Sequence, residues 1–160
     1  MKRSMDSYYA DVLRHTFPQL SSHINAAFLY LTTPHSPSVQ SIQNHFDHSQ
    51  NIVPVSLQDL LEKQQIPGRA IYDGAFSIAP SMTNDATYAQ WSSALEQISQ
   101  RLSPRGKLLL ELPGGSDISA FRDILGKNDY RSTYTKQQTP ARDVWRIIAK
   151  PSGQLSIPYR

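Results

Sequence analysis

Apolar positions fall into helical stripes and short continuous runs that alternate along the chain. The most regular stripe has the 3.6-residue period of an amphipathic helix and comprises Tyr88, Trp91, Leu95, Ile98 and Leu102. It predicts a helix over 88–102, ended by a turn at 103–106 in which Gly106 is expected to adopt positive φ. The Leu-rich run 107–112 then predicts a strand buried on both faces of a sheet.

The rest of the chain repeats this alternation of strand and helix. Helical spacing predicts helices over 6–20, 39–46 and 57–61, and another that Ser116 or Asp117 caps. Apolar runs predict strands over 23–32, 52–57 and 70–79, the second of them irregular or at an edge because it contains Pro54. Residues 130–136 and 144–149 predict an antiparallel hairpin at the sheet edge.

This order of elements predicts an α/β fold with three layers (αβα) and a mostly parallel, Rossmann-like sheet that ends in an antiparallel hairpin. The length of 160 residues suits one domain with a real core. We expect that domain to cover 1–150. Residues 151–160 are interpreted as the start of a linker, because Pro151, Gly153 and Pro158 interrupt them.

Composition narrows the function classes. The chain has no cysteine, which excludes disulfides, zinc ribbons and iron–sulfur ligation within it. The formal charge is +3, but the basic residues are scattered along the sequence, so nucleic-acid binding is not expected. No apolar run approaches the roughly 20 residues that cross a bilayer, and the N-terminus lacks a signal-peptide core. We expect a cytoplasmic protein without membrane contact.

The turn after the first strand is the position at which such a sheet normally holds a nucleotide-like cofactor, on a glycine-rich loop. Here the turn reads Thr32-Thr33-Pro34-His35-Ser36-Pro37, with two prolines and no glycine. Proline fixes φ and removes an N–H donor. No acid directly follows Val55 at the end of the second strand, and Asp59 is interpreted as a helix-start charge. Cofactor binding is therefore not expected.

Two other groups have the residue types of reactive sites. His45, Asp47 and His48 could ligate a metal, but their loose spacing favours a solvated helix end. Ser77 lies in a predicted buried strand, and no G-x-S-x-G elbow is present, which argues against Ser/His/Asp hydrolysis.

Glycine and aromatic residues have structural explanations as well. Gly114-Gly115 could cradle an anion before a capped helix, but a plain strand-to-helix loop is the favoured interpretation. Trp91, Trp145 and the tyrosines are interpreted as core and edge packing rather than stacking platforms. We therefore predict no catalytic, cofactor-binding or metal-binding residue in this chain.

Two family resemblances follow from these segments. Tyr72–Ile78, Leu95–Arg101 and Leu102–Leu108 resemble the later strands and helix of class I S-adenosylmethionine-dependent methyltransferases. The order of segments across nearly the whole chain also resembles the N-terminal domain of the anamorsin family. The segments that carry this second resemblance are Thr32–Ser38, Val55–Leu61, Tyr72-Asp73, Leu102–Gly106 and Leu155–Pro158.

The anamorsin resemblance implies a shortened methyltransferase-like fold that has lost its cofactor loop and is not an enzyme. It also implies a role in cytosolic iron–sulfur cluster assembly, with clusters held by a cysteine-rich C-terminal region outside this chain. The implied partners are an NADPH-dependent diflavin reductase and a monothiol glutaredoxin, bound by a monomer through a protein-interaction surface. The alternatives are an S-adenosylmethionine-dependent methyltransferase and a methyltransferase-like structural subunit of another complex.

Overall fold

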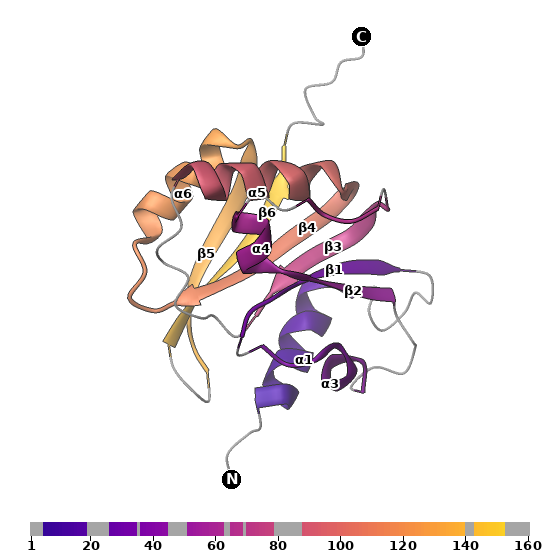
Figure 1. Cartoon of the computed structure of the whole chain (residues 1–160). Helices are drawn as coiled ribbons and strands as arrows, with labels where there is room; N and C mark the ends of the chain where they lie inside the picture. The colour runs from indigo at the N-terminus through magenta and orange to yellow at the C-terminus, as the bar shows by residue number, and fades with distance from the viewer. Residues whose placement is uncertain are drawn as a thin grey trace.

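The computed structural model describes residues 5–18, 26–34, 36–44, 51–62, 65–68, 70–78, 88–139 and 143–152. Its strands are β1 (Ala27–Thr32), β2 (Asn51–Ser56), β3 (Tyr72–Ser77), β4 (Leu102–Pro113), β5 (Tyr130–Gln138) and β6 (Asp143–Pro151). Its helices are α1 (Met5–Thr16), α3 (Val39–Gln43), α4 (Leu57–Leu61), α5 (Tyr88–Gln100) and α6 (Ile118–Lys127). Figure 1 shows the strands side by side in one twisted sheet between helices.

The described strands form a six-stranded sheet with the order β2-β1-β3-β4-β6-β5. The pairs β1–β2, β1–β3 and β3–β4 are parallel, whereas β6 runs antiparallel to both β4 and β5. The doubly wound, mostly parallel fold and its antiparallel C-terminal hairpin are therefore confirmed. Pro54 lies in β2, at one edge of the sheet, where the ladder tolerates a missing N–H donor.

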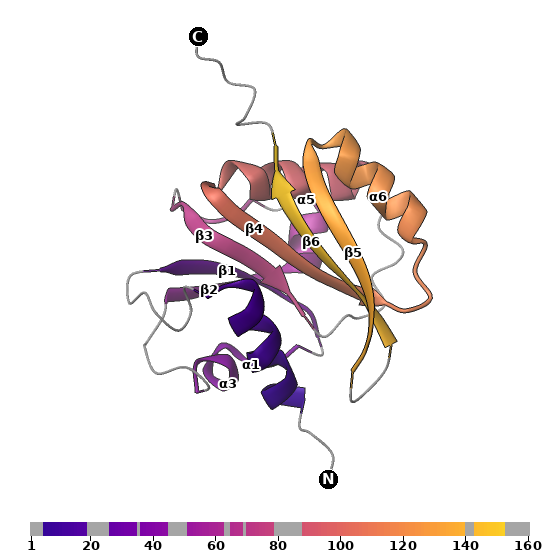
Figure 2. The ribbon, with the colours of Figure 1, turned by 180° about the vertical axis from the view of Figure 1, so that it is seen from behind.

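Helices cover both faces of the sheet (Figure 2), which gives two core clusters. The first contains residues of α4, α5 and α6, and the second contains residues of α1 and α3. The Leu-rich run of β4 serves both clusters, because alternate side chains of a strand point to opposite faces. Leu108 and Leu110 pack on the α4–α6 side, and Leu109 packs on the α1 side.

A close approach fixes α1 on the sheet. The Phe17 ring, just after α1, lies against Gly74 of β3, where an added Cβ would be 2.5 Å from Phe17 Cε1. Phe17 also contacts Phe28 of β1 edge to face, with ring centroids 5.4 Å apart. A glycine in this strand therefore serves close packing of an aromatic ring.

The predicted turn at 103–106 is wrong. Helix α5 ends at Gln100 and β4 already begins at Leu102, which pairs with Tyr72 before the register shifts and Gly74 pairs with Lys107. The Tyr72 N–H donates to the Arg101 carbonyl oxygen at 2.6 Å, so the strand pairing starts immediately after the helix. Gly106 lacks positive φ; it is instead crowded, with Leu102 Cβ 3.1 Å from the position of an added Cβ.

The C-terminal elements match their prediction. Asp117 caps α6 by accepting the Ala120 N–H at 3.1 Å, and β5 and β6 form the expected hairpin, with β6 inside the sheet and β5 at its edge. Residues 153–160 of the predicted linker lie outside the described residues. None of the helices in the described ranges is long and apolar enough to cross a membrane.

Candidate functional site

The strand order reverses direction between β1 and β3. The chain passes from β1 to β2 on one side, and β3 then pairs with the opposite edge of β1. In open α/β sheets, ligands bind outside the carboxyl ends of the strands at such a switch point. The candidate site is therefore the carboxyl edge formed where β1 ends at Thr32, β2 at Ser56 and β3 at Ser77.

The described residues of the turn after β1 form hydrogen bonds with one another. The Thr33 N–H donates to Ser36 Oγ at 2.9 Å, and the Ser36 N–H donates to the Thr33 carbonyl oxygen at 3.1 Å. Pro34 and Pro37 have no N–H, and the Pro37 carbonyl accepts the Tyr30 hydroxyl at 2.6 Å. The Thr33 and Ser36 N–H groups are thus used inside the turn, whereas a glycine-rich loop would present such donors to a ligand. His35 lies outside the described residues.

The side chain at the end of β2 also forms a local hydrogen bond. Ser56 Oγ accepts the Asp59 N–H at 3.2 Å and thereby caps α4. Asp59 is exposed in the first turn of that helix, where a negative charge complements the unpaired N–H groups. Its predicted role as a helix-start charge is confirmed.

A buried ion pair lies at the same edge of the sheet, on the side of α1. Glu111 of β4 and Arg146 of β6 pair directly across the strands, with Arg146 Nε 3.6 Å from Glu111 Oε2. Arg146 Nη2 donates to the Tyr8 hydroxyl of α1. The Glu111 side chain is fully buried, and the Arg146 side chain is 19% exposed.

The register between β3 and β4 places Glu111 next to the switch point. Ser77, the last residue of β3, pairs with Leu110, so Glu111 is the first β4 residue beyond the end of β3. Sequence analysis missed it, although a single acid inside an otherwise apolar strand was a usable signal, because a buried charge needs a partner. The partner, Arg146, follows 35 residues later and could not be identified without the strand pairing.

Two predicted candidates have structural roles. Gly114 donates its N–H to the Asp143 carbonyl oxygen at 3.0 Å, and a Cβ on Gly114 would also be 3.0 Å from that oxygen. This glycine therefore permits a close approach to β6, as expected of a strand-to-helix loop. Trp91 is buried and contacts Phe121 edge to face, with centroids 4.9 Å apart, and Trp145 packs against the same core cluster.

The remaining candidates do not form a reactive cluster. Ser77 is buried in β3 as predicted. His45, Asp47 and His48 lie outside the described residues, and within the described ranges no three His, Cys, Asp or Glu side chains are grouped to hold a metal. A surface cavity of about 290 Å³ lies along α6, between Arg122 and Lys127, and not at the switch point.

Comparison with known proteins shows the fold. No protein-family model matches the chain, and no curated protein matches it. The chain is similar to the precorrin-6y C5,15-methyltransferase of Geobacter metallireducens GS-15, with a TM-score of 0.57, 13% identity, and coverage of 91% of this chain and 89% of that one. It is also similar to a TehB-like SAM-dependent methyltransferase of Corynebacterium glutamicum, with a TM-score of 0.51, 11% identity, and 91% and 97% coverage.

A third similar structure is SAM-bound CalS10, an amino pentose methyltransferase of Micromonospora echinaspora, with a TM-score of 0.51, 10% identity and 89% coverage of both chains. These likenesses confirm the predicted class I methyltransferase-like α/β fold. They contradict the prediction of a non-catalytic, anamorsin-like interaction domain that is not an enzyme, because these three similar structures are methyltransferases. The anamorsin resemblance, the two partner proteins, the iron–sulfur clusters and the cytoplasmic location stay predictions.

Proposed function

We propose that this chain is an S-adenosylmethionine-dependent methyltransferase whose site is the carboxyl edge of β1, β2 and β3. The observation that carries the proposal is the switch point between β1 and β3 in a sheet whose solved counterparts are methyltransferases. When bound, S-adenosylmethionine supplies an electrophilic methyl group. The task of the protein is then to hold an acceptor next to it, exclude water and take up the acceptor's proton.

The residues after β1 do not fit the usual grip on this cofactor. The Thr33 and Ser36 N–H groups are bonded inside the turn, Pro34 and Pro37 have none, and Ser56 Oγ is committed to the α4 cap. A cofactor at this edge therefore has to be held by contacts other than a glycine-lined cradle. This misfit makes cofactor binding the decisive measurement.

The Glu111–Arg146 pair is the proposed acceptor side. Its carboxylate and guanidinium lie one residue beyond the end of β3, and the Arg146 side chain retains partial solvent contact. The Arg146 guanidinium can hold an acidic or polar group of an acceptor, and the fully buried Glu111 carboxylate orients that guanidinium. The Tyr8 hydroxyl accepts a hydrogen bond from Arg146, so α1 borders the proposed acceptor side.

The test is calorimetric and thermal titration of residues 1–160 with S-adenosylmethionine and S-adenosylhomocysteine. Binding at about 100 times Kd stabilises by about 2.7 kcal/mol, which raises the Tm of a domain of this size by about 5–10 °C. Thr33→Tyr, at the end of β1, should abolish the shift. Gln100→Tyr, exposed at the end of α5, is the control and should retain it.

A flat titration with both compounds up to millimolar concentration, for a protein with a cooperative melt, would refute the proposal. Equal loss of binding in Thr33→Tyr and Gln100→Tyr would move the site away from the carboxyl end of β1. In the first case a methyltransferase-like structural subunit of a complex would be the better explanation of the closed Thr33–Ser36 turn.

A further inference from the structure

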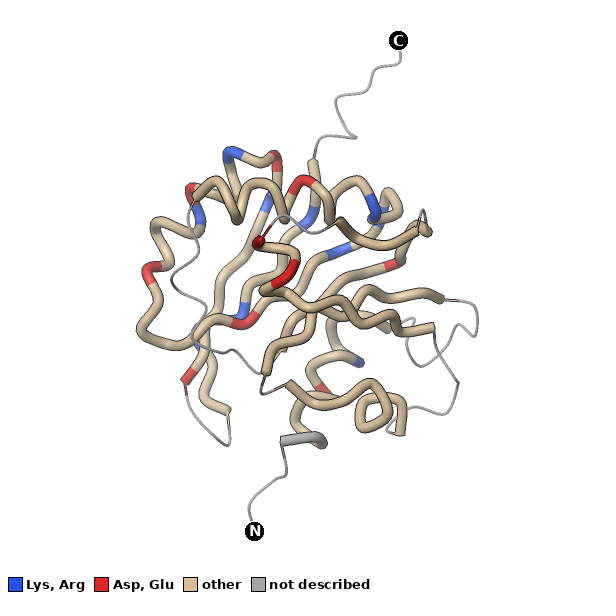
Figure 3. Tube along the Cα trace, in the orientation of Figure 1, with Lys and Arg blue, Asp and Glu red and all other residues tan. Residues whose placement is uncertain are grey.

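Three cations far apart in the sequence form one row across the sheet. Arg131 of β5 pairs with Lys150 of β6. Leu108 of β4 pairs with Ala149, so the preceding Lys107 stands opposite Lys150. Figure 3 shows Lys and Arg positions next to one another on these three strands.

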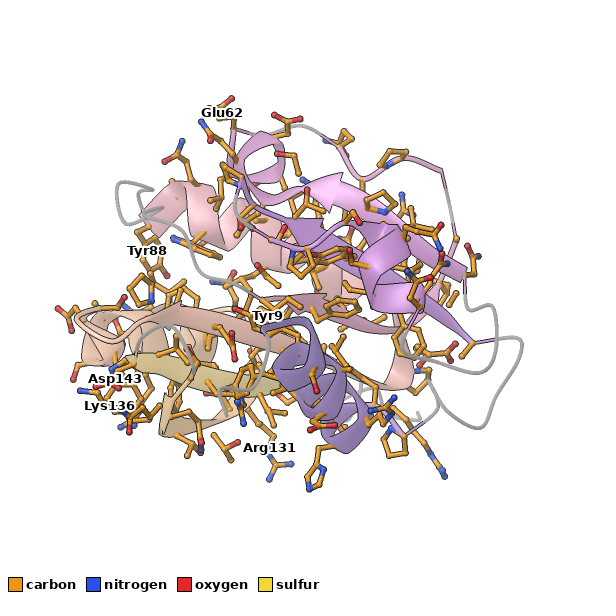
Figure 4. The ribbon with its side chains drawn as sticks, turned by 90° about the horizontal axis from the view of Figure 1, so that it is seen from below. Tyr9, Glu62, Tyr88, Arg131, Lys136 and Asp143 are labelled. Carbon is orange, nitrogen blue, oxygen red and sulfur yellow. The ribbon has the colours of Figure 1, made fainter. Side chains whose placement is uncertain are left out.

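The three side chains share one face, on the side of α1. Leu109 and Ile148, each two residues from a member of the row, pack in the core cluster that contains the α1 residues. Side chains two apart on a strand point the same way, which places Lys107 and Lys150 on that face. Arg131 follows by its pairing with Lys150. Figure 4 shows Arg131 and Lys136 projecting into solvent at separate places.

The row is not balanced by acids in the part of the chain that the structure describes. Lys150 and Arg131 are exposed, Lys107 is half-buried, and none of the three forms an ion pair with a described residue. Like charges directly opposite each other on neighbouring strands destabilise a sheet. Repulsion within the row therefore lowers the stability of the folded protein, and a bound polyanion would relieve this repulsion.

The end of α1 borders the row of cations. Phe17 contacts Gly74, which pairs with Lys107, so the end of α1 lies beside the row. The last turn of α1 carries Arg14 and His15, and Arg14 is paired with Asp11 at 3.2 Å. Asp11 offsets the charge of Arg14, so the positive charge of this surface comes from Lys107, Lys150 and Arg131.

The uncovered face of β5 and β6 continues from the row toward the candidate site. Thr133 and Thr135 are exposed on β5, and Arg146 lies at the other end, paired with Thr135. From Lys150 to Arg146 the strand rises about 13 Å, and the row itself spans two strand spacings, or about 10 Å. The three cations of the row offer contacts to three backbone phosphates.

We propose that the Lys107–Lys150–Arg131 row binds the backbone phosphates of a single-stranded nucleic acid. Lysine and arginine neutralise phosphates, and hydroxyl groups such as those of Thr133 and Thr135 donate to phosphate and sugar oxygens. A bilayer surface fits less well, because the exposed large apolar side chains in the described ranges, Ile71 and Tyr88, are not on β4, β5 or β6. This binding is independent of methyl transfer and needs no methyl donor.

The test measures fluorescence anisotropy of labelled 12-nucleotide RNA and DNA strands with residues 1–160, at 50 and 200 mM salt. Three phosphate contacts on a single strand weaken binding about 20-fold over this fourfold salt change. The row variant Lys107→Ala/Lys150→Ala/Arg131→Ala should bind at least tenfold more weakly at 50 mM, with a nearly flat salt dependence. Its Tm should equal or exceed that of the parent, because the repulsion is removed.

The matched control is Arg122→Ala/Lys127→Ala/Lys136→Ala, which removes the same charge from α6 and from the other face of β5. It should bind within twofold of the parent. Equal losses in both triple variants would assign the binding to net charge and overturn the proposal. So would the absence of parent binding at 50 mM salt, or tighter binding to phosphatidylserine vesicles that only the row variant loses.

Discussion

Arg146 and Glu111 face each other on neighbouring antiparallel strands, with Nε 3.6 Å from Oε2 and the carboxylate fully removed from solvent. Burying two charges costs several kcal/mol for each ion, and their attraction recovers this cost only when both are present. The Tyr8 hydroxyl, which accepts from the guanidinium, ties α1 to the pair. The pair thus couples the helix that covers the sheet to the edge at which the proposed methyl transfer takes place.

Removing one partner should therefore cost much more than removing both. Arg146→Met removes the cation that faces the buried Glu111 carboxylate, and we expect a loss of about 3–5 kcal/mol in the free energy of unfolding, measured with urea. The double variant Glu111→Leu/Arg146→Met should return to near the parent. Arg14→Met, which breaks the exposed pair with Asp11, should change stability by less than about 1 kcal/mol. Equal losses in the free energy of unfolding for Arg146→Met and Arg14→Met would show that the buried pair contributes no more to stability than the exposed pair.

Gly74 should tolerate no side chain. A Cβ there would lie 2.5 Å from Phe17 Cε1 and 2.8 Å from Cδ1, so Gly74→Ala forces the ring or α1 outward. We expect a loss of about 1–3 kcal/mol, measured by chemical denaturation. Gly126→Ala is the matched control: it lies in α6 with open space around its added Cβ, and helix propensity predicts a gain of about 1 kcal/mol. A neutral Gly74→Ala would mean that Phe17 is not held against β3.

The sequence was most informative where periodicity and burial coincide. The apolar run from Phe28 to Leu31 became a strand with all four side chains fully buried, and the 88–102 stripe became α5 with Trp91 and Leu95 in the core. The prediction of a turn at Ser103–Gly106 was wrong, although a Pro and a Gly after a helix usually mark a turn. Here pairing with β3 begins at Leu102 and absorbs both residues in an irregular part of β4.

The sites depended on contacts that the sequence order does not reveal. Glu111 and Arg146 are brought together by the β4–β6 pairing, and Lys150 joins Arg131 through the β5–β6 register. Cations that are scattered along the chain become neighbours only when the antiparallel register is known. Charge patterning could therefore not identify the row, whereas the turn chemistry at Thr33 was readable from its prolines.

Stability should fall in alkali because of Tyr130. Desolvation by burial raises the pKa of its hydroxyl, and a hydrogen bond with Ser99 lowers the pKa by less. The hydroxyl also donates to the Leu95 carbonyl at 2.6 Å. A folded-state pKa above the unfolded value of about 10 means that the contribution is complete below about pH 10 and is lost as the pH rises beyond it.

The expected slope is a loss of about 1.4 kcal/mol for each pH unit above about pH 10, up to the raised pKa. Tyr130→Phe should remove this part of the pH dependence and cost about 1 kcal/mol at neutral pH through the lost hydrogen bond. Urea denaturation from pH 8 to 11 measures both effects. Tyr88→Phe, at a tyrosine that is 47% exposed, should keep the parent's slope. The same slope in Tyr130→Phe and the parent would show that another group dominates alkaline unfolding.

Arg101 should not be replaceable by lysine. Its guanidinium donates to the carbonyl oxygens of Ile66 at 2.9 Å and Ala70 at 3.2 Å, and also to that of Gly68. A planar fork of donors reaches these carbonyls together, whereas an ammonium group at the end of a flexible stem cannot satisfy the same geometry. The loop that leads into β3 is thereby fastened to the end of α5. Gly68 supports this shape, because its φ of 74° suits glycine.

We expect Arg101→Lys to lower the free energy of unfolding by about 1–3 kcal/mol. It should also speed amide hydrogen exchange in 65–72 more than elsewhere, since fewer bonds hold that loop. Arg105→Lys is the matched control, because Arg105 is exposed and forms no hydrogen bond with the described part of the chain. Unchanged exchange in 65–72 for Arg101→Lys would mean that the Gly68 turn holds the loop by itself. Faster exchange in this loop alone would show that the guanidinium fixes the entry into β3, and with it the strand whose carboxyl end borders the proposed site.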